Sequence, residues 1–320
     1  MEKRKLLITG AFGYVGSRVA QFLAKNSDYT LILASRKTGR EKPNWLNNGY
    51  IAELDLNNQL SIENVLDDVT AIIHLAAPNE IESRNYPYDA YSATAFGTYF
   101  LLEAAIKKGV KRFIYFSTAH VYGSPLIGTL TENMPTRPQH PYSISHRWAE
   151  DLVLYSSDSK QIDGVVLRLS NSVGAPAVEG VDRWSLIVND LCKQAIQNKK
   201  LILKTSGLQK RDFITLYDVS RAVEYFLKFI FPDNDSRIYN LGGGRSISIL
   251  EITEIIQKRS EILIGHKPVI EVPSLKNTER NETLNFSIEK LVSTGFSLIG
   301  SIEKEVDDTL MYCQRIYGRK

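Results

Sequence analysis

Cysteine is scarce in this chain, and its scarcity excludes two kinds of protein. The 320 residues include 2 cysteines, Cys192 and Cys313, and neither lies in a CxxC or histidine-rich neighbourhood. Two isolated cysteines cannot build the disulfide framework of a small secreted domain, and we predict no metal site. A reducing compartment, the cytoplasm, is the expectation that follows.

Long apolar runs and a strong charge of either sign are also missing. No apolar run approaches the ~20 residues that a membrane span needs, and residues 6–8 are too short a run for a signal-peptide core. The net charge of +3 is too small to indicate a nucleic-acid or membrane partner. With 43% hydrophobic and 23% charged residues, the composition is that of a globular protein.

A glycine-rich turn lies near the start of the chain. An apolar run at residues 6–8 leads into Gly10, Gly13 and Gly16, and a helical apolar pattern follows at once. Glycine permits positive φ and close approach of a ligand, and a helix N-terminus offers free N–H groups. The turn therefore predicts a site for a dinucleotide pyrophosphate, the alternative being a glycine turn that serves packing alone.

Strand-like and helix-like stretches alternate through the first 170 residues. The expected strands after the first one lie at residues 30–34, 51–55, 71–75, 111–116 and 165–169, with helices at 91–108 and from 142 onward. This alternation predicts an α/β fold with a doubly wound parallel Rossmann sheet. We expect a dinucleotide-binding domain over residues 1–170 and about 211–241. A smaller, interleaved C-terminal substrate domain would take about 171–210 and 242–320.

Two local signals predict helix starts in the second half of the chain. Asp218 is a plausible N-cap for a helix that follows it. Ser248 and Glu251 have the spacing of a capping box.

The residues just past the second strand bear on the choice of cofactor. An acidic residue there would bind the adenosine ribose 2′-hydroxyl, whereas an arginine would accept a 2′-phosphate. Residues 34–37 read Ala-Ser-Arg-Lys and include no acid. NADP is therefore favoured over NAD, with Ser35 and Arg36 at the ribose, unless Arg36 and Lys37 only form a basic surface loop.

Three further residues carry chemistry. Tyr142 and His146 are four apart on a predicted helix and therefore share a face, and Thr118 follows the fifth strand. A tyrosine with a lowered pKa can exchange a proton with a carbonyl or alcohol substrate. Alternatively, Tyr142 and His146 are only surface residues of that helix. His74 lies within a strand and is interpreted as a packed histidine.

Taken in order, these motifs resemble the extended short-chain dehydrogenase/reductase family of nucleotide-sugar epimerases, dehydratases and reductases. The matching stretches are T-G-A-F-G-Y-V-G from Thr9, Asp55-Leu56, H-L-A-A from His74, S-T-A-H-V-Y-G from Ser117, P-Y-S-I-S-H from Pro141, R-L-S-N from Arg168, R-D-F-I from Arg211 and Y-N-L-G from Tyr239. The resemblance covers almost the whole chain.

The resemblance implies roles for individual residues. The implied catalytic residues are Thr118, Tyr142 and His146. The implied cofactor-binding residues are Gly10, Phe12, Gly13, Tyr14, Val15, Gly16, Ser35, Arg36, Asp55, Leu56, Leu75, Ala76, Ala77, Tyr142 and His146. The implied substrate-binding residues are Thr118, Ala119, His120, Asn171, Arg211 and Arg280.

Three positions depart from the family pattern. His146 replaces the catalytic lysine that binds the nicotinamide ribose and lowers the tyrosine pKa, and we hypothesise that a nearby tyrosinate keeps His146 charged. Ala119-His120 replaces the Asp-Glu pair of the 4,6-dehydratases, so dehydration is disfavoured, and His120 has either a proton-transfer or a structural role. Thr94 stands where an asparagine is usual.

The resemblance implies an NAD(P)-dependent enzyme that acts on a nucleotide-linked sugar by hydride transfer, as a ketosugar reductase or an epimerase. The alternative is a catalytically impaired NADP(H)-binding sensor, which the missing lysine motivates. The family commonly dimerises through the helices after strands four and five, so a homodimer is expected.

Overall fold

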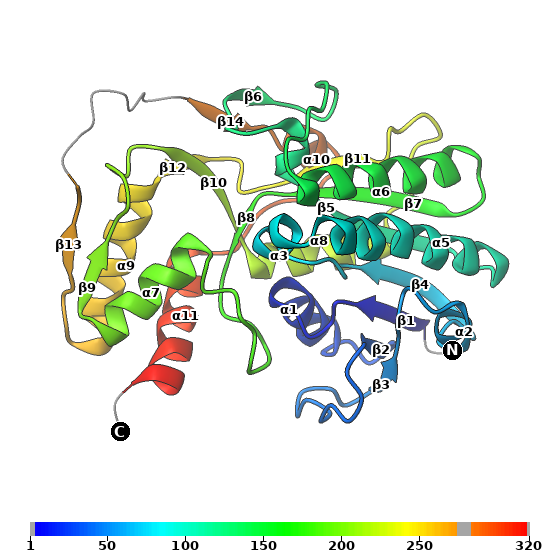
Figure 1. Ribbon diagram of the computed structural model, residues 1–320, viewed down its shortest axis with the longest axis horizontal. Coiled ribbons are helices and arrows are strands. Elements are labelled where there is room, and N and C mark those ends of the chain that lie inside the picture. Colours follow the sequence, from blue (N-terminus) through cyan, green and yellow to red (C-terminus); the bar gives the residue numbers. More distant parts are fainter. Residues whose placement is uncertain (1–3, 274–282, 319–320) are drawn as a thin grey trace.

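The computed structural model describes residues 4–273 and 283–318, so the substrate residue predicted at Arg280 lies outside the described residues. Its centre is a seven-stranded sheet in which every neighbouring pair is parallel (Figure 1). The strand order is β11 (Ile238–Leu241), β7 (Asp163–Leu169), β5 (Arg112–Thr118), β4 (Val69–His74), β1 (Arg4–Thr9), β2 (Tyr29–Ser35) and β3 (Gly49–Glu53). The chain starts at β1, winds outward to β3, and then returns through β4 to wind toward β11. The predicted doubly wound α/β fold is confirmed.

Helices cover both faces of this sheet. One face carries α1 (Tyr14–Leu23) and α8 (Leu216–Lys228), and the other carries α2 (Gln59–Asn64), α5 (Gly97–Lys107) and α6 (Pro141–Asp158). Each side has its own apolar core, because the strands alternate buried side chains toward both faces. Two such cores explain why the strands read as continuous apolar runs in the sequence.

The helix expected at residues 91–108 is present, but its first part is a π-helix rather than an α-helix. After α3 (Glu80–Asn85), the chain forms α4 (Pro87–Ala90), a π-helical turn (Tyr91–Phe96) and then α5. The hydroxyl of Thr98, in the first turn of α5, donates to the carbonyl of Thr94 in the π-helical turn over 2.5 Å. A π-turn adds one residue to one helical turn, and the apolar spacing of the sequence does not distinguish it from an α-helix.

The two predicted helix starts have different outcomes. The capping box of Ser248 and Glu251 at the start of α9 (Ile249–Ile264) is confirmed. Asp218 is not the N-cap of α8, because Thr215 takes that place and its hydroxyl accepts the Asp218 amide over 3.0 Å. The Asp218 carboxylate accepts instead from the amides of Ile299 and Gly300, in a segment far along the chain.

A second, smaller lobe packs beside the carboxyl end of the sheet. Its core lies between α7 (Ile187–Gln197), α9 and α11 (Ile302–Tyr317), which Figure 1 shows grouped away from α2 and β3. Its strands are β8 (Asn171–Val173), β10 (Lys210–Thr215) and β12 (Ser246–Ser248) in one sheet, with β9 (Lys200–Ile202) paired to β13 (Val269–Glu271). The strands β6 (Gly128–Leu130) and β14 (Leu284–Phe286) pair beside α10 (Glu289–Ser293). None of the helices in the described ranges combines the length and apolarity that crossing a bilayer demands.

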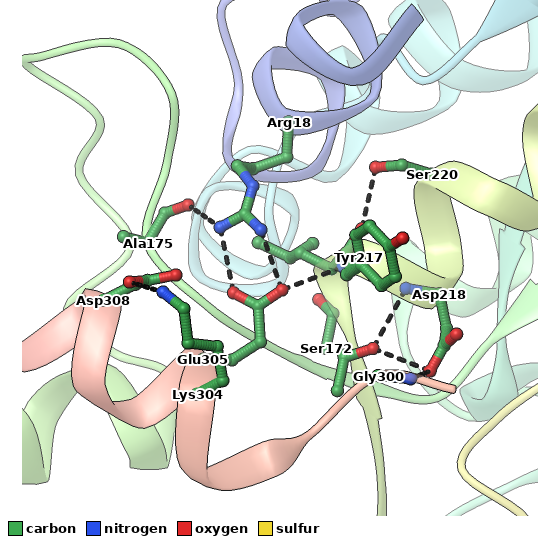
Figure 2. Close-up of polar contacts among 12 residues, drawn as sticks. Arg18, Ser172, Ala175, Tyr217, Asp218, Ser220, Gly300, Lys304, Glu305 and Asp308 are labelled. Atoms are coloured by element: carbon green, nitrogen blue, oxygen red, sulfur yellow. Dashed lines mark hydrogen bonds and ion pairs between the residues drawn. The ribbon is translucent and has the colours of Figure 1, made fainter. Parts of the chain in front are cut away.

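A partly buried ion pair joins the two lobes, with Glu305 buried and Arg18 partly exposed. Figure 2 shows Arg18 of α1 reaching the Glu305 carboxylate of α11, with N–O distances of 2.7 and 2.9 Å. Arg18 also donates to the Ala175 carbonyl, and Glu305 accepts the Tyr217 amide at the start of α8. The helix that follows the glycine turn is thereby fixed to the second lobe.

Candidate active site

A cavity of about 410 Å³ lies where the carboxyl ends of β1, β4, β5 and β7 meet the second lobe. Ligands of doubly wound sheets bind at this edge. Of the predicted site residues, the cavity is lined by Gly10, Phe12, Gly13, Tyr14, Val15, Gly16, Leu75, Ala77, Thr118, Ala119, His120, Tyr142, His146 and Asn171. Ser35, Arg36, Asp55, Leu56, Ala76 and Arg211 do not line it.

The glycine turn has the close-packed geometry that its spacing predicts. Gly10 has φ +65°, and a Cβ on it would lie 2.8 Å from the Leu75 backbone carbonyl. A Cβ on Gly16 would collide with the Gly10 carbonyl oxygen. Gly13 is the N-cap of α1, and no side chain among the described residues caps this helix. The turn thus presents an uncapped helix N-terminus to the cavity, which suits a phosphate.

Thr118 and Tyr142 enter the cavity from different elements. Thr118 ends β5, and Tyr142 lies in the first turn of α6, after Pro141. Burial raises the pKa of Tyr142, and Glu80 acts in the same direction, while Arg183 and the Thr118 hydroxyl act to lower that pKa. Tyr142 therefore keeps its hydrogen near neutral pH and can act as a hydrogen-bond donor.

His146 lies beside Tyr142, as their spacing on one helix face predicts. The two rings meet edge to face with centroids 4.5 Å apart. Burial lowers the pKa of His146 to about 4, although Glu80 and the Phe116 carbonyl act to raise it. His146 is therefore neutral beside a protonated Tyr142, because desolvation outweighs the nearby negative groups, and a His146 charged by a tyrosinate stays a prediction.

An ion pair that no sequence pattern indicated spans the cavity. Glu80 of α3 accepts from Arg183 of the second lobe, with N–O distances of 3.1 and 3.4 Å. Both residues line the cavity together with His120, whose pKa burial lowers. Arg183 lies in a loop, and only the fold brings it within reach of a residue 103 positions earlier.

The end of β2 is a tight basic loop. The Ser35 hydroxyl accepts from the Lys37 amide and from Arg40 Nε, each over 3.0 Å. Arg40 also stacks on Phe12, 4.4 Å from the ring centroid. Arg36, Lys37 and Arg40 have no acidic partner among the described residues. The sequence reasoning missed Arg40, which lies five residues beyond the strand.

His74 is a packed residue, as interpreted from the sequence. It is fully buried between Thr9 Oγ1 at 2.6 Å and Thr98 Oγ1 at 3.0 Å. Thr9 Oγ1 already accepts from the Leu75 and Ala76 amides, so its hydrogen points to the histidine. This chain of bonds fixes the end of β4 against the glycine turn.

Two predicted substrate residues lie where β8 and β10 pair. Asn171 Nδ2 donates to the Asp212 carbonyl over 2.9 Å. Arg211 donates to the Lys210 carbonyl and has no acidic partner among the described residues. A half-buried guanidinium without a carboxylate is suited to an anionic ligand.

The fold and this cavity define a Rossmann-type α/β protein in which a tyrosine, Tyr142, lines the same cavity as the glycine turn. Residues 6–242 match the model of the NAD dependent epimerase/dehydratase family, and the chain belongs to that family. The expected relation to extended short-chain dehydrogenases is thereby confirmed.

Three relatives and solved structures show how distant the similarity is. The chain is 24% identical over 267 residues to the UDP-glucose 4-epimerase of Halalkalibacterium halodurans, with 79% of each chain covered. It is 29% identical over 294 residues to UDP-arabinose 4-epimerase 1 of Arabidopsis thaliana, covering 82% of this chain and 69% of the relative. The structure of UDP-glucuronic acid 4-epimerase from Bacillus cereus, in complex with UDP-glucuronic acid and NAD, has a TM-score of 0.79 and 25% identity. It covers 98% of this chain and 100% of that chain.

Proposed function

We propose that this protein is a nucleotide-sugar oxidoreductase or epimerase in which Tyr142 is the acid/base. The observation that carries the proposal is that Thr118 and Tyr142 line the same cavity as the glycine turn. The relatives named as UDP-sugar 4-epimerases support a nucleotide-linked sugar as the substrate, with UDP as the nucleotide. Dehydration is disfavoured because Ala119 and His120 follow Thr118, where it would require an acid and a base.

The residues of the cavity fit a dinucleotide. The uncapped start of α1 lies at one end, and His146 Nε2, a buried polar atom without a partner in the described structure, belongs to a residue that lines the same cavity. When bound, the dinucleotide supplies the hydride acceptor or donor. In the proposed reaction Thr118 holds the sugar oxygen, Tyr142 takes or returns its proton, and His146 donates a hydrogen bond to a ribose hydroxyl.

NADP is the proposed cofactor in preference to NAD. Three cations at the end of β2 lack acidic partners among the described residues, and no acid is present there to bind a ribose 2′-hydroxyl. The three are Arg36, Lys37 and Arg40. A 2′-phosphate would supply the missing anion. Arg211 is the proposed contact for the pyrophosphate of the sugar nucleotide.

A sensor that binds NADP(H) without turnover is the second candidate. The neutral His146 favours it, because no cation stands at the position of the family lysine to lower the pKa of Tyr142. The arrangement of Thr118, Tyr142 and Asn171 around one cavity favours the enzyme.

Turnover of a defined panel separates the two candidates. Purified protein would be incubated with NADP or NAD and with UDP-glucose, UDP-galactose or UDP-glucuronic acid, and the sugar products resolved by chromatography. We expect a product or a change in nicotinamide absorbance. Tyr142→Phe should lower the rate at least about 100-fold and have a much smaller effect on NADP affinity. Tyr155→Phe, on the exposed side of the same helix, is the matched control.

Other results would reassign the protein. Tight NADP binding with no conversion of any sugar would favour the sensor. A Tyr142→Phe variant as active as the wild type would exclude Tyr142 as the acid/base. A lower Kd for NAD than for NADP would overturn the cofactor preference.

A homodimer is also proposed. Large apolar side chains on the π-turn, α5 and α6 are 42–67% exposed, and they are Phe96, Tyr99, Phe100, Trp148 and Tyr155. Phe96 and Trp148 meet edge to face with centroids 4.9 Å apart, so the exposed side chains form a joint surface. Light scattering on the purified protein gives the oligomeric state directly.

A further inference from the structure

The two ring nitrogens of His146 have different surroundings. Nδ1 lies 2.7 Å from the Tyr115 hydroxyl, and both side chains are buried, at 4% and 2% exposure. Nε2 is also buried and makes no geometrically well-formed hydrogen bond within the described residues, although the Phe116 carbonyl lies close enough to the ring to act on its pKa. Nδ1 is therefore paired within the protein, whereas Nε2 is available to a group from outside it.

Hydrogen-bond accounting selects one tautomer of the imidazole. The Tyr115 hydroxyl has no second acceptor among the described residues. If Nδ1 carried the hydrogen, both the Tyr115 hydrogen and the Nε2 lone pair would be buried without partners. If Tyr115 donates to Nδ1, only the Nε2 hydrogen lacks a partner. Each unpaired buried polar group costs about 1–3 kcal/mol, so the second arrangement is preferred.

The protonation states agree with this arrangement. Burial raises the pKa of Tyr115 well above its ordinary value, so the hydroxyl keeps its hydrogen. Burial lowers the pKa of His146 to about 4, so the ring carries a single hydrogen near neutral pH. The titratable groups that act on the pair are Tyr142, His74, Glu80 and Glu150.

We propose that Tyr115 is a positioning residue, which holds His146 as the Nε2–H tautomer so that this N–H is a hydrogen-bond donor to the bound dinucleotide. The inference rests on the proposed function for the identity of the ligand. In the family, one lysine both donates a hydrogen bond to the nicotinamide ribose and supplies a positive charge. His146 keeps the donor role at a ribose hydroxyl, and the positive charge is absent.

The tautomer can be read without any substrate. The chain has 5 histidines, so protein labelled with nitrogen-15 histidine gives few ring signals, and His146→Gln identifies those of residue 146 by their loss. Long-range proton–nitrogen spectra at pH 7.5 should show a neutral His146 with its hydrogen on Nε2. An Nδ1–H ring or an imidazolium in the wild type would overturn the proposal.

Tyr115→Phe removes only the hydroxyl and keeps the ring in the core. The share of the Nδ1–H tautomer should then rise, and the Kd for NADP should increase roughly threefold to tenfold, the equivalent of one hydrogen bond. Tyr29→Phe is the matched control, because Tyr29 is another buried strand tyrosine and lies on β2, which is not a neighbour of β5 in the sheet. Tyr29→Phe should change neither the tautomer of His146 nor the Kd for NADP.

The outcomes separate this inference from the proposed function. An unchanged tautomer and an unchanged Kd in Tyr115→Phe would refute the role of Tyr115 even if the protein converts sugar nucleotides. The expected tautomer shift would support that role even in a protein that converts none. Thermal unfolding of each variant shows whether it is folded, and the wild-type spectrum alone tests the tautomer if Tyr115→Phe is not.

Discussion

Asp212 is a buried carboxylic acid at the junction of the two lobes. Its side chain is 1% exposed, with Oδ1 accepting from the Ser170 hydroxyl over 2.5 Å and from the Gly243 amide over 2.8 Å. Oδ2 has no partner within the described residues. Burial raises the pKa of Asp212 to about 6, against the hydrogen bonds that act to lower it. The acid is therefore protonated in the folded protein at pH values where it is ionised in the unfolded chain.

This difference makes the stability dependent on pH. A raised folded-state pKa means that the contribution of Asp212 is fully present below pH ~4 and is lost as the pH rises through about 6. Within that window the free energy of unfolding should fall by up to about 1.4 kcal/mol per pH unit relative to Asp212→Asn, which cannot ionise. Urea unfolding of both proteins between pH 4.5 and 7.5 measures the slopes. If the free energy of unfolding depended on pH equally in the wild type and in Asp212→Asn, the pKa of Asp212 would not be raised.

For individual residues, the sequence predicted which side chains lie together in the cavity better than it predicted their protonation states. Thr118, Tyr142 and His146 were found from spacing and motif, and they do line one cavity. The neutral state of His146 was not predictable, because desolvation depends on what covers the ring. The Glu80–Arg183 pair was missed because it joins two lobes, and no local pattern connects the residues.

At the scale of elements, the turn between β1 and α1 depends on glycine for steric reasons. Gly16→Ala would bring a methyl group against the Gly10 carbonyl oxygen, and backbone atoms cannot yield as a side chain can. We expect the start of α1 to move away from the turn and the Kd for NADP to rise at least about tenfold. Fluorescence titration with NADP measures this change.

Gly109→Ala is the control for that substitution. Gly109 follows α5 with φ +71°, and a Cβ there would meet nothing within 4 Å. It should lose about 1 kcal/mol of stability through backbone strain and leave NADP affinity unchanged. Equal affinities in Gly16→Ala and the wild type would show that the turn tolerates a methyl group and would remove the steric argument.

Helices and strands were predictable from the sequence where a single local pattern determines them. Apolar runs placed the parallel strands, and the Ser248 capping box placed the start of α9. The π-turn before α5 and the Thr215 cap of α8 were not predicted. The π-turn keeps the apolar spacing of an α-helix, and the local contact of Thr215 with the Asp218 amide was passed over in favour of Asp218. Asp218 looks like a cap in sequence, yet its carboxylate binds two amides more than 80 residues away.

At the scale of the whole molecule, the Arg18–Glu305 pair connects the cofactor helix to the second lobe. Glu305 is 2% exposed, and it accepts both the Arg18 guanidinium and the Tyr217 amide. Removing one partner of a buried pair leaves an uncompensated charge, which costs about 3–5 kcal/mol. Replacing both partners by apolar residues removes that penalty.

A double-mutant cycle therefore tests how the lobes are joined. We expect Arg18→Met and Glu305→Met each to lower the free energy of unfolding by about 3 kcal/mol, and the double variant to lose clearly less than the sum. Because Arg18 lies on the helix that begins at the glycine turn, each single variant should also bind NADP more weakly than the double variant. Urea unfolding and NADP titration of the four proteins give both results. Additive losses of stability would mean that the two side chains act independently, and the pair would then not couple the second lobe to the cofactor helix.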